Sequence, residues 1–578
     1  MSIRSVAAVV LSIFVAAGAL AQVRPEPAGT PAEKMDGGAP SYIRPETPEQ
    51  RRTRLGTAED PGHNPDPKVE YWRFGHRYII EKYDRKFAAY DASPGQVRPF
   101  AMANFAYEIY QQNDKYVWVW MPLPDPQPEP TPGSRPLHDA PAEKVSPFTK
   151  EQTDYLKKVA PEYEPVSVPA STRTVRFEES SQGLPTGGSW RNSGDLADMN
   201  GDGHVDVLAP PQRGMSTLPT VFLGDGKGGW KIWNSVWPYE IQYGNVIAAD
   251  FNGDKKMDVA AGVHLAGVRV FLGDNKGNFI DASKGLPMRD FPTRRVVATD
   301  VDGDGDQDLL AIYEGPSGMG GINGSRVRAF INQNRASEWK WINAAAPEDL
   351  NGGDWLATGR FNDDKYPDFV TSSNYFQATD LLYRSTGAAK WEKYASDGTL
   401  IPFLSVHSAV AAGRLSSKKY DDAVISFSRH WPKEIDPSIV PTPTLNAGMV
   451  GLDRISFAGR EPKRIPLVRF ASERAIGGVA VADFDGDRNN DIIYTQWDPR
   501  EFVLLLGDGK GGFVRATLEG IKAEENPNYD VHIGDVNADG RPDVMVMYES
   551  NAESRLGEQN GSIRVFLNRG PAKVAAAR

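Results

Sequence analysis

An aspartate-rich nonapeptide that recurs about every fifty residues constrains this chain most. Five copies keep the full pattern and begin at Asp198, Asp250, Asp300, Asp483 and Asp535. Two weaker copies, RFNDDKYPD from Arg360 and RLSSKKYDD from Arg414, lie between the third and the sixth copies in sequence. Successive copies are 52, 50, 60, 54, 69 and 52 residues apart. A period of this size indicates a solenoid, a propeller or a similar array.

The sequence around each copy predicts short strands. NVIAAD precedes the second copy, DVAAGV completes it, and VRVFLG follows after a variable loop. A glycine-rich turn such as GDGKGG then leads into a fourth strand, which starts at an aromatic residue (Trp230, Phe279 or Phe513). Four short antiparallel strands per repeat, arranged radially, make a propeller blade. The sequence therefore predicts an all-β, seven-bladed β-propeller.

The last repeat lacks a fourth strand of its own, since no further strand is predicted after its third strand, IRVFLNRG. The upstream segment TVRFEESSQGLP is similar to GNFIDASKGLP, which ends the second repeat. We therefore expect residues 175–178 to supply the outer strand of the last blade and to close the ring, which leaves no open sheet edge. This places the propeller at residues 174–570 and a tail at 571–578.

The repeated D-x-[DN]-x-D-G-x-x-D runs between apolar strands resemble FG-GAP/VCBS repeats, the calcium-loop repeats of integrin-type propellers. The resemblance covers about residues 174–570. It implies a calcium-binding propeller.

The residue types in the loops support the same metal. Calcium takes six to eight oxygen ligands, and positions 1, 3, 5 and 9 of each intact loop carry Asp or Asn. For any single loop, a polar turn without metal is the alternative. Every ligand comes from one loop, whereas a catalytic metal keeps an open position, so we expect about five structural Ca²⁺ ions. The predicted ligands are Asp198, Asn200, Asp202, the His204 carbonyl, Asp206, Asp250, Asn252, Asp254, Asp258, Asp300, Asp302, Asp304, Asp308, Asp483, Asp485, Asp487, Asp491, Asp535, Asn537, Asp539 and Asp543.

Charge and the irregular copies refine this prediction. The formal net charge is −11, and five Ca²⁺ would bring the chain close to neutrality. In the fourth and fifth copies Arg360, Arg414 and Lys418 stand at ligand positions, so we expect no calcium there. Arg360 is predicted to pair with Asp364 and Asp368 instead. Lys255 and Arg488 stand where glycine would favour a left-handed turn.

The N-terminus predicts export. Residues 1–21 combine Arg4, an apolar run and the small-x-small sequence Ala19-Leu20-Ala21, as in a secretory signal peptide cleaved before Gln22. A membrane anchor is the alternative. There is no cysteine and no second long apolar run, so we expect a periplasmic or secreted protein without a lipid anchor or membrane span. The sequence contains no basic patch of the kind that would indicate nucleic-acid binding.

Residues 22–170 predict a small α+β region with a Pro-rich linker, DPQPEPTPGSRP. We expect one helix capped by Thr47, a second over residues 67–91, and a hairpin that turns at Gln112–Asp114. This region either packs on the propeller or docks a partner.

No GxSxG, HExxH or P-loop pattern occurs, and the sequence identifies no catalytic residue. We expect a module that binds protein or glycan through the loops joining strand four to strand one and strand two to strand three, because arginine and aromatic side chains are common anchors. The candidates there are Trp190, Arg191, Tyr243, Arg294, Arg295, Trp355, His407, Arg474 and Tyr529. Two alternatives remain: a lyase-like polysaccharide enzyme with a base in a deep cleft, and a scaffold subunit of an exported complex.

Overall fold

The structure, a computed structural model, describes residues 22–24, the strands between Lys68 and Trp120, residues 149–159 and most of 164–572. The signal segment, the segment around Thr47, the Pro-rich linker and residues 573–578 lie outside the described residues. Inside the last range the description omits 160–163, 214–217, 265, 289–290, 315–325, 347–352, 354, 373–380, 395–408, 431–438, 440–447, 460, 473–475, 498, 527 and 551–559. Contacts divide the chain into two compact units, with a boundary after Ala140.

The described part of the first unit consists of strands. One sheet has the order β1-β7-β6-β5, with β1 (Gln22–Arg24), β5 (Phe100–Met102), β6 (Phe105–Gln112) and β7 (Lys115–Trp120). A second has the order β2-β3-β4, with β2 (Lys68–Arg73), β3 (His76–Tyr83) and β4 (Lys86–Asp91). The hairpin predicted at Gln112–Asp114 is confirmed by the pairing of β6 with β7.

The helix predicted over residues 67–91 is wrong, because strands β2, β3 and β4 occupy this segment. Only two residues separate β2 from β3 and β3 from β4, and so short a connection favours antiparallel pairing over a helix. Tyr71 stands opposite Tyr78 in the register, and Ile79 opposite Tyr90. Aromatic and β-branched cross-strand pairs of this kind stabilise sheets, so apolar residues spaced for one helix face serve two strand faces instead.

Helix α3 (Lys150–Val159) opens the described part of the second unit. A reciprocal cap begins it: the Gln152 amide donates to Thr149 Oγ1 (3.2 Å), and the Thr149 amide donates to Gln152 Oε1 (2.9 Å). No helix in the described part of the chain has the length and apolar character needed to cross a bilayer.

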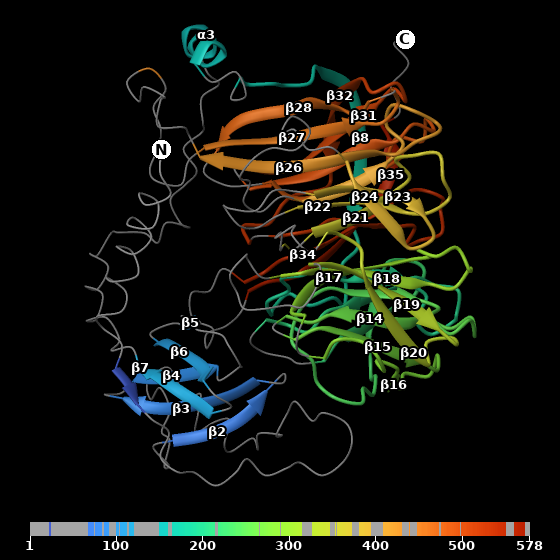
Figure 1. The fold of residues 1–578 in the computed structure, drawn as a ribbon. Coiled ribbons are helices and arrows are strands. Elements are labelled where there is room, and N and C mark those ends of the chain that lie inside the picture. Colours follow the sequence, from blue (N-terminus) through green and yellow to red (C-terminus); the bar gives the residue numbers. More distant parts are fainter. Residues whose placement is uncertain are drawn as a thin grey trace. The chain divides into compact units, whose positions relative to one another are not determined.

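Five four-stranded antiparallel sheets follow in chain order, each built from one repeat (Figure 1). The first three contain β9 (Asp195–Ala197), β10 (Asp206–Ala209), β11 (Thr220–Gly224), β12 (Trp230–Trp233); β13 (Val246–Ala249), β14 (Asp258–Gly262), β15 (Val268–Gly273), β16 (Phe279–Asp281); and β17 (Thr293–Thr299), β18 (Asp308–Tyr313), β19 (Val327–Gln333), β20 (Glu338–Asn343).

The fourth and fifth repeats form the next two sheets. They contain β21 (Trp355–Gly359), β22 (Asp368–Ser372), β23 (Leu381–Gly387), β24 (Lys390–Lys393); and β25 (Val410–Gly413), β26 (Asp422–His430), β27 (Gly448–Ser456), β28 (Lys463–Ser472). Figure 1 shows the long strands β26, β27 and β28 of the fifth repeat side by side in orange.

The sixth and seventh repeats share one eight-stranded sheet, in the order β29-β30-β31-β32-β8-β35-β34-β33. Its strands are β29 (Ile476–Ala482), β30 (Asp491–Trp497), β31 (Arg500–Gly507), β32 (Phe513–Glu519), β8 (Ala170–Glu179), β35 (Ile563–Pro571), β34 (Asp543–Met547) and β33 (His532–Gly534). Strand β8 pairs antiparallel with β35 from Val175 to Glu179, which confirms residues 175–178 as the missing outer strand. It also pairs parallel with β32, a contact that the sequence did not predict.

The first strand of each repeat contacts the first strand of the next repeat. In chain order these strands are β9, β13, β17, β21, β25, β29 and β33, and β33 in turn contacts β9. The second unit is therefore all-β apart from α3 in its described residues, with a propeller-like arrangement of sheets. The predicted aromatic starts are also confirmed, because β12, β16 and β32 begin at Trp230, Phe279 and Phe513.

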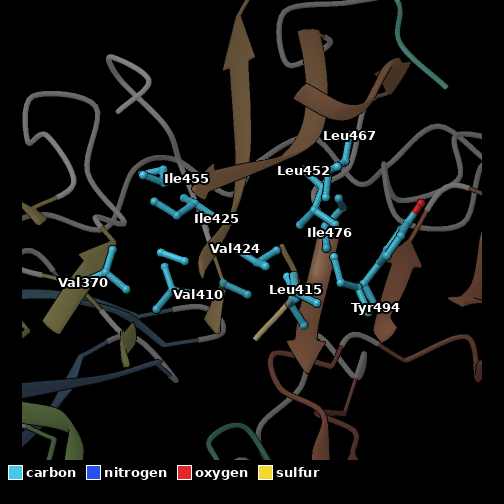
Figure 2. Close-up of a cluster of buried hydrophobic side chains, with 14 of the residues drawn as sticks. Val370, Val410, Leu415, Val424, Ile425, Leu452, Ile455, Leu467, Ile476 and Tyr494 are labelled. Carbon is cyan, nitrogen blue, oxygen red and sulfur yellow. The ribbon is translucent and has the colours of Figure 1, made fainter. Parts of the chain in front are cut away.

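Apolar side chains from neighbouring sheets make the core. In the largest buried cluster of the described residues, Val370, Val424, Leu452 and Ile476 come from four strands of three repeats. Figure 2 shows Val370 beside Val410, and Leu452 beside Ile476. Burying one such side chain contributes about 1.5–3 kcal/mol, so the sheets stabilise each other chiefly through these faces. The aspartate loops lie at strand ends, and those of the fourth and fifth repeats each place their second residue, Phe361 and Leu415, in this cluster.

Candidate metal centres and binding face

The carboxylate at position 1 organises each intact loop. In loop 1 (residues 198–206), Asp198 accepts the amides of Gly201 (2.8 Å), Asp202 (3.0 Å) and Gly203 (2.8 Å). Loops 2 (250–258) and 6 (483–491) repeat all three bonds, and loops 3 (300–308) and 7 (535–543) repeat two of them. The chain is thereby wrapped around the first side chain.

Positions 3 and 5 each accept the amide two residues further on. In loop 1, Asn200 Oδ1 accepts the Asp202 amide (2.9 Å), and Asp202 Oδ1 accepts the His204 amide (2.9 Å). Such Asx turns fix the side-chain oxygens. Oxygens of Asp300, Asp302 and Asp304 lie within 4.8 Å of one another, as do those of Asp483, Asp485 and Asp491. These groupings of hard oxygen donors fit calcium, whereas the His204 carbonyl stays a predicted ligand.

A sequence model described as an FG-GAP-like repeat matches residues 250–311 and 483–546. Each match spans two successive aspartate loops, so loops 2, 3, 6 and 7 are covered. The chain carries FG-GAP-like repeats.

Two solved structures match this chain at low similarity. One is BBS1N in complex with ARL6DN, soaked with lead: identity is 11%, TM-score 0.40, and the match covers 70% of this chain and 99% of that one. The other is a fungal alcohol oxidase of the AA5 family in complex with copper, with 10% identity, TM-score 0.41 and coverage of 69% and 80%. No curated protein matches the sequence.

The aspartate at position 9 does something more general than the predicted metal ligation. It is 0% exposed in all seven repeats: Asp206, Asp258, Asp308, Asp368, Asp422, Asp491 and Asp543. In loop 1, Asp206 Oδ2 accepts the Met199 amide (2.8 Å) and Oδ1 accepts the Gly224 amide (2.8 Å). It thus ties the loop to the third strand. Loops 4 and 5 keep it although Arg360 and Arg414 replace the position-1 aspartate, so its presence alone does not indicate calcium.

Burial makes this carboxylate costly to ionise. It raises the pKa of Asp308 and of Asp491 to about 7 and that of Asp206 to about 6, although two backbone amides donate to each. A cation nearby would favour the charged form. The buried aspartate therefore fits a loop that holds calcium beside it.

In loop 5 (414–422), a protein cation occupies the vicinity of the buried aspartate, but it is not the predicted one. Arg454 on β27 places Nη1 2.7 Å from Asp422 Oδ2, with side chains 4% and 0% exposed. Arg414 is exposed, and its Nε lies 4.0 Å from Oδ1 of Asp421, the residue before the buried aspartate. The sequence missed Arg454 because it lies 32 residues beyond Asp422, in the third strand.

In loop 4 (360–368), the pairing predicted for Arg360 is wrong. Its side chain is exposed, and no ion pair joins it to Asp364 or Asp368 in this described loop. The side-chain amide of Asn362 (Nδ2) donates to Asp364 Oδ2 at 3.3 Å and to Asp368 Oδ1 at 3.1 Å instead. A short amide satisfies these oxygens without burying a charge.

Loop 6 receives a cation from a distant strand. Arg173 on β8 lies 2.8 Å from Asp485 Oδ2 and 3.8 Å from Asp487 Oδ2, and the Asp485 side chain is 1% exposed. The sequence could not show this contact, because it depends on the parallel pairing of β8 with β32. Loop 6 is thus the one intact loop, within the described residues, in which an arginine contacts the predicted calcium ligands from another repeat.

The left-handed turn at position 6 is confirmed. Its φ is 90° at Gly203 and 97° at Gly305, and Lys255 and Arg488 take 66° and 70° at the same place. Non-glycine residues hold this conformation at a cost of roughly 1 kcal/mol, so loops 2 and 6 carry strain that loops 1, 3 and 7 avoid at this position.

Among the predicted ligand-face residues, the two tryptophans are structural. Trp190 is 1% and Trp355 2% exposed. Trp190 Nε1 donates to the Gly187 carbonyl (3.1 Å), and Trp355 Nε1 donates to the Tyr529 carbonyl (3.1 Å). His407 and Arg474 lie outside the described residues.

Four other predicted residues, Arg191, Tyr243, Arg294 and Tyr529, meet in what we call the arginine–tyrosine cluster. Its members are Arg191, Arg213, Tyr243, His264, Arg294, Glu314, Tyr529 and Glu549. The Arg191 guanidinium lies 4.7 Å from the Tyr529 ring centre and donates to Glu549 (3.2 Å). Arg213 pairs with the same Glu549. Burial would raise the pKa of Glu549, but Arg191 and Arg213 hold it below its usual range.

The cluster continues around Tyr243. The guanidinium groups of Arg213 and Arg294 lie 5.7 and 5.8 Å from the Tyr243 ring centre. Arg294 Nε is 3.0 Å from Glu314 Oε2, and His264 Nδ1 is 2.6 Å from the same oxygen. Arg295, also predicted, lies apart and pairs with Asp530 (2.5 Å). The cluster thus combines residues of the seventh, first, second and third repeats.

Four cluster residues were missed by the sequence reasoning: Arg213, His264, Glu314 and Glu549. A signal for three of them exists. His264, Glu314 and Glu549 each stand six residues after the position-9 aspartate of their repeat, just beyond the second strand. Aligning the repeats on that aspartate would have brought these three to one column.

Proposed function

We propose that this chain is an exported, calcium-stabilised propeller of seven blades that acts as a binding module for a protein or glycan. The cycle of contacts through the seven first strands, with β33 against β9, supports the ring. The repeat family and the sheet-rich fold support an interaction role. Export rests on the signal-like residues 1–21.

We include calcium in this proposal because, in each of the five intact loops, the backbone wraps around the first carboxylate and several side-chain oxygens lie close together. The position-1, position-3 and position-5 side chains would hold the ion, and the buried position-9 carboxylate lies beside it. Bound calcium supplies positive charge that the clustered carboxylates lack, and it binds the folded loop in preference to the unfolded chain. Its role is structural.

One observation supports a ligand-binding surface here: loops of four repeats come together to form the arginine–tyrosine cluster. Arginine and tyrosine are enriched among the residues that dominate binding energy. Glu314 and Glu549 hold the guanidinium groups in fixed positions, so the face is preorganised. Arg213, with a side chain 29% exposed, is the member best placed to reach a ligand.

The test is a glycan array together with a pull-down from an extract of the source cells, using calcium-loaded full-length protein. The ligand found should bind Arg213→Ala at least about tenfold more weakly, and a matched Lys390→Ala change on β24 should leave binding unaltered. Equal binding by all three proteins would place the ligand elsewhere. A ligand captured only through residues 22–170 would favour the scaffold alternative.

A second candidate, a lyase-like polysaccharide enzyme, is favoured by one arrangement in the cluster. His264 is oriented through Nδ1 by Glu314, and its ring centre lies 4.4 Å from that of Tyr243, beside Arg294. An oriented imidazole can act as a base, and an arginine can neutralise a uronic carboxylate. Acidic polysaccharides should then yield unsaturated products, which absorb ultraviolet light, and His264→Ala should abolish the signal. Without such products the binding role stands alone.

A further inference from the structure

A cavity of about 500 Å³ lies between the fifth and sixth repeats, away from the arginine–tyrosine cluster. Loop 5 and the end of β25 line one side, and loop 6, β29 and Gly509 line the other. It is therefore formed between two blades at the end where the aspartate loops lie. None of the predicted ligand-face residues lines it.

The lining is cationic. Arg414, Lys418 and Arg488 contribute three positive charges, and Asp421 is the one acidic residue in the lining. Asp421 is already engaged, because its Oδ2 accepts the Arg360 amide (2.8 Å) and its Oδ1 lies 4.0 Å from Arg414 Nε. Neither Lys418 nor Arg488 forms an ion pair with any acidic residue in the described part of the chain. The cavity thus carries a net excess of about two positive charges.

The origin of these cations makes the site specific to this pair of repeats. Arg414 and Lys418 stand at positions 1 and 5 of loop 5, where intact loops carry aspartate. Arg488 stands at position 6 of loop 6 with φ 70°, where glycine is found in three other loops. The side-chain amides of Asn489 and Asn490 add neutral hydrogen-bond groups to the lining.

We propose that this cavity binds an oxyanion: a sulfate, phosphate or carboxylate group of a ligand. Arginine forks and lysine ammonium groups form charge-assisted hydrogen bonds to such groups. The alternative use of the three cations, as a solvated rim, gives no saturable binding. The site takes an anion and none of its lining residues belongs to the arginine–tyrosine cluster, so it goes beyond the proposed function.

The experiment measures binding of sulfate, methyl phosphate and galacturonate to the full chain by calorimetry, with sodium chloride keeping ionic strength constant. One or more probes should bind saturably, and the order of affinities distinguishes a tetrahedral anion from a carboxylate. Lys418→Gln/Arg488→Gln should bind at least about tenfold more weakly, because two charge-assisted contacts are lost.

The matched control removes the same total charge elsewhere. Lys231 and Lys390 are exposed strand residues without an ion pair in the described part of the chain, so K231Q/K390Q should bind as the natural protein does. Both double variants should melt at the same temperature when no anion is present, which excludes a folding defect. The proposal is overturned if no probe binds above the chloride background, or if both double variants lose affinity equally.

Discussion

One carboxylate recurs in the same role in all seven repeats. The position-9 aspartate is fully buried and, in six of the seven, takes the amide of the residue after position 1 together with an amide of the third strand. What differs between repeats is the positive charge beside it. Arg454 supplies this charge in loop 5, whereas in the intact loops we propose that calcium does.

The first prediction concerns Arg454. Arg454→Met should lower the free energy of unfolding by about 3–5 kcal/mol, because it leaves Asp422 buried without its cation. Urea unfolding measures this. The double change Arg454→Met/Asp422→Asn should recover a large part of the loss, since both charges are then gone. A loss below about 1 kcal/mol for the single variant would show that the pair is not what stabilises loop 5.

The second prediction concerns Arg173, which contacts Asp485 and Asp487. A cation beside calcium ligands repels the ion, so Arg173→Gln should tighten calcium binding at one site and leave the others unchanged. Calcium titration by calorimetry measures this. Arg176→Gln, an exposed neighbour on the same strand without an ion pair in the described residues, is the control. Unchanged affinities in Arg173→Gln would show that Arg173 does not compete with calcium.

At the scale of elements, strand β8 links two repeats. It completes the seventh repeat through β35 and joins the sixth through β32. Val175 and Phe177, at 0% and 5% exposed, bury one face of it in the core. Its loss would expose unpaired amide and carbonyl groups on two strands.

The third prediction follows from this position. A chain beginning at Glu164 keeps β8 and the backbone pairing of Val166 with Arg469, so it should fold as a monomer. A chain beginning at Gly183 lacks β8 and should aggregate or melt at a much lower temperature. Thermal melting and gel filtration compare them. Indistinguishable behaviour would mean that closure by β8 contributes little to stability.

The elements were predictable where local pattern and pairing agree. The strands around each loop, the aromatic starts of β12, β16 and β32, and the closing role of Val175–Glu178 all follow from the repeats. The segment 67–91 was misread, because its apolar residues fit one helix face as well as two strand faces. Arg173 and Arg454 could not be found, since their contacts depend on pairing between strands distant in sequence.

At the scale of the whole molecule, the buried aspartates couple stability to pH. Burial raises the folded-state pKa of Asp308, Asp368 and Asp491 to about 7, whereas an unfolded aspartate titrates near 4. Between these values the folded chain binds more protons than the unfolded chain. The stability of the metal-free protein therefore falls as pH rises from about 4 to 7.

The fourth prediction is that calcium-free protein, prepared by dialysis, melts at a lower temperature at pH 8 than at pH 5.5. Calcium should remove most of this loss, because the ion favours the ionised carboxylates. Melting curves at both pH values, with and without calcium, measure this. A metal-free protein that is more stable at pH 8 would contradict the assignment of these aspartates as groups with raised pKa.

The central claim is that five loops hold calcium and two do not. Calcium bound per chain, measured by elemental analysis after gel filtration in trace calcium, tests it most directly. The account predicts four to five ions in the natural protein, one fewer in Asp304→Ala, and no change in Asp364→Ala of loop 4, together with a marked drop in melting temperature on chelation. One ion or none per chain, or a melting curve that chelator leaves unchanged, would contradict it.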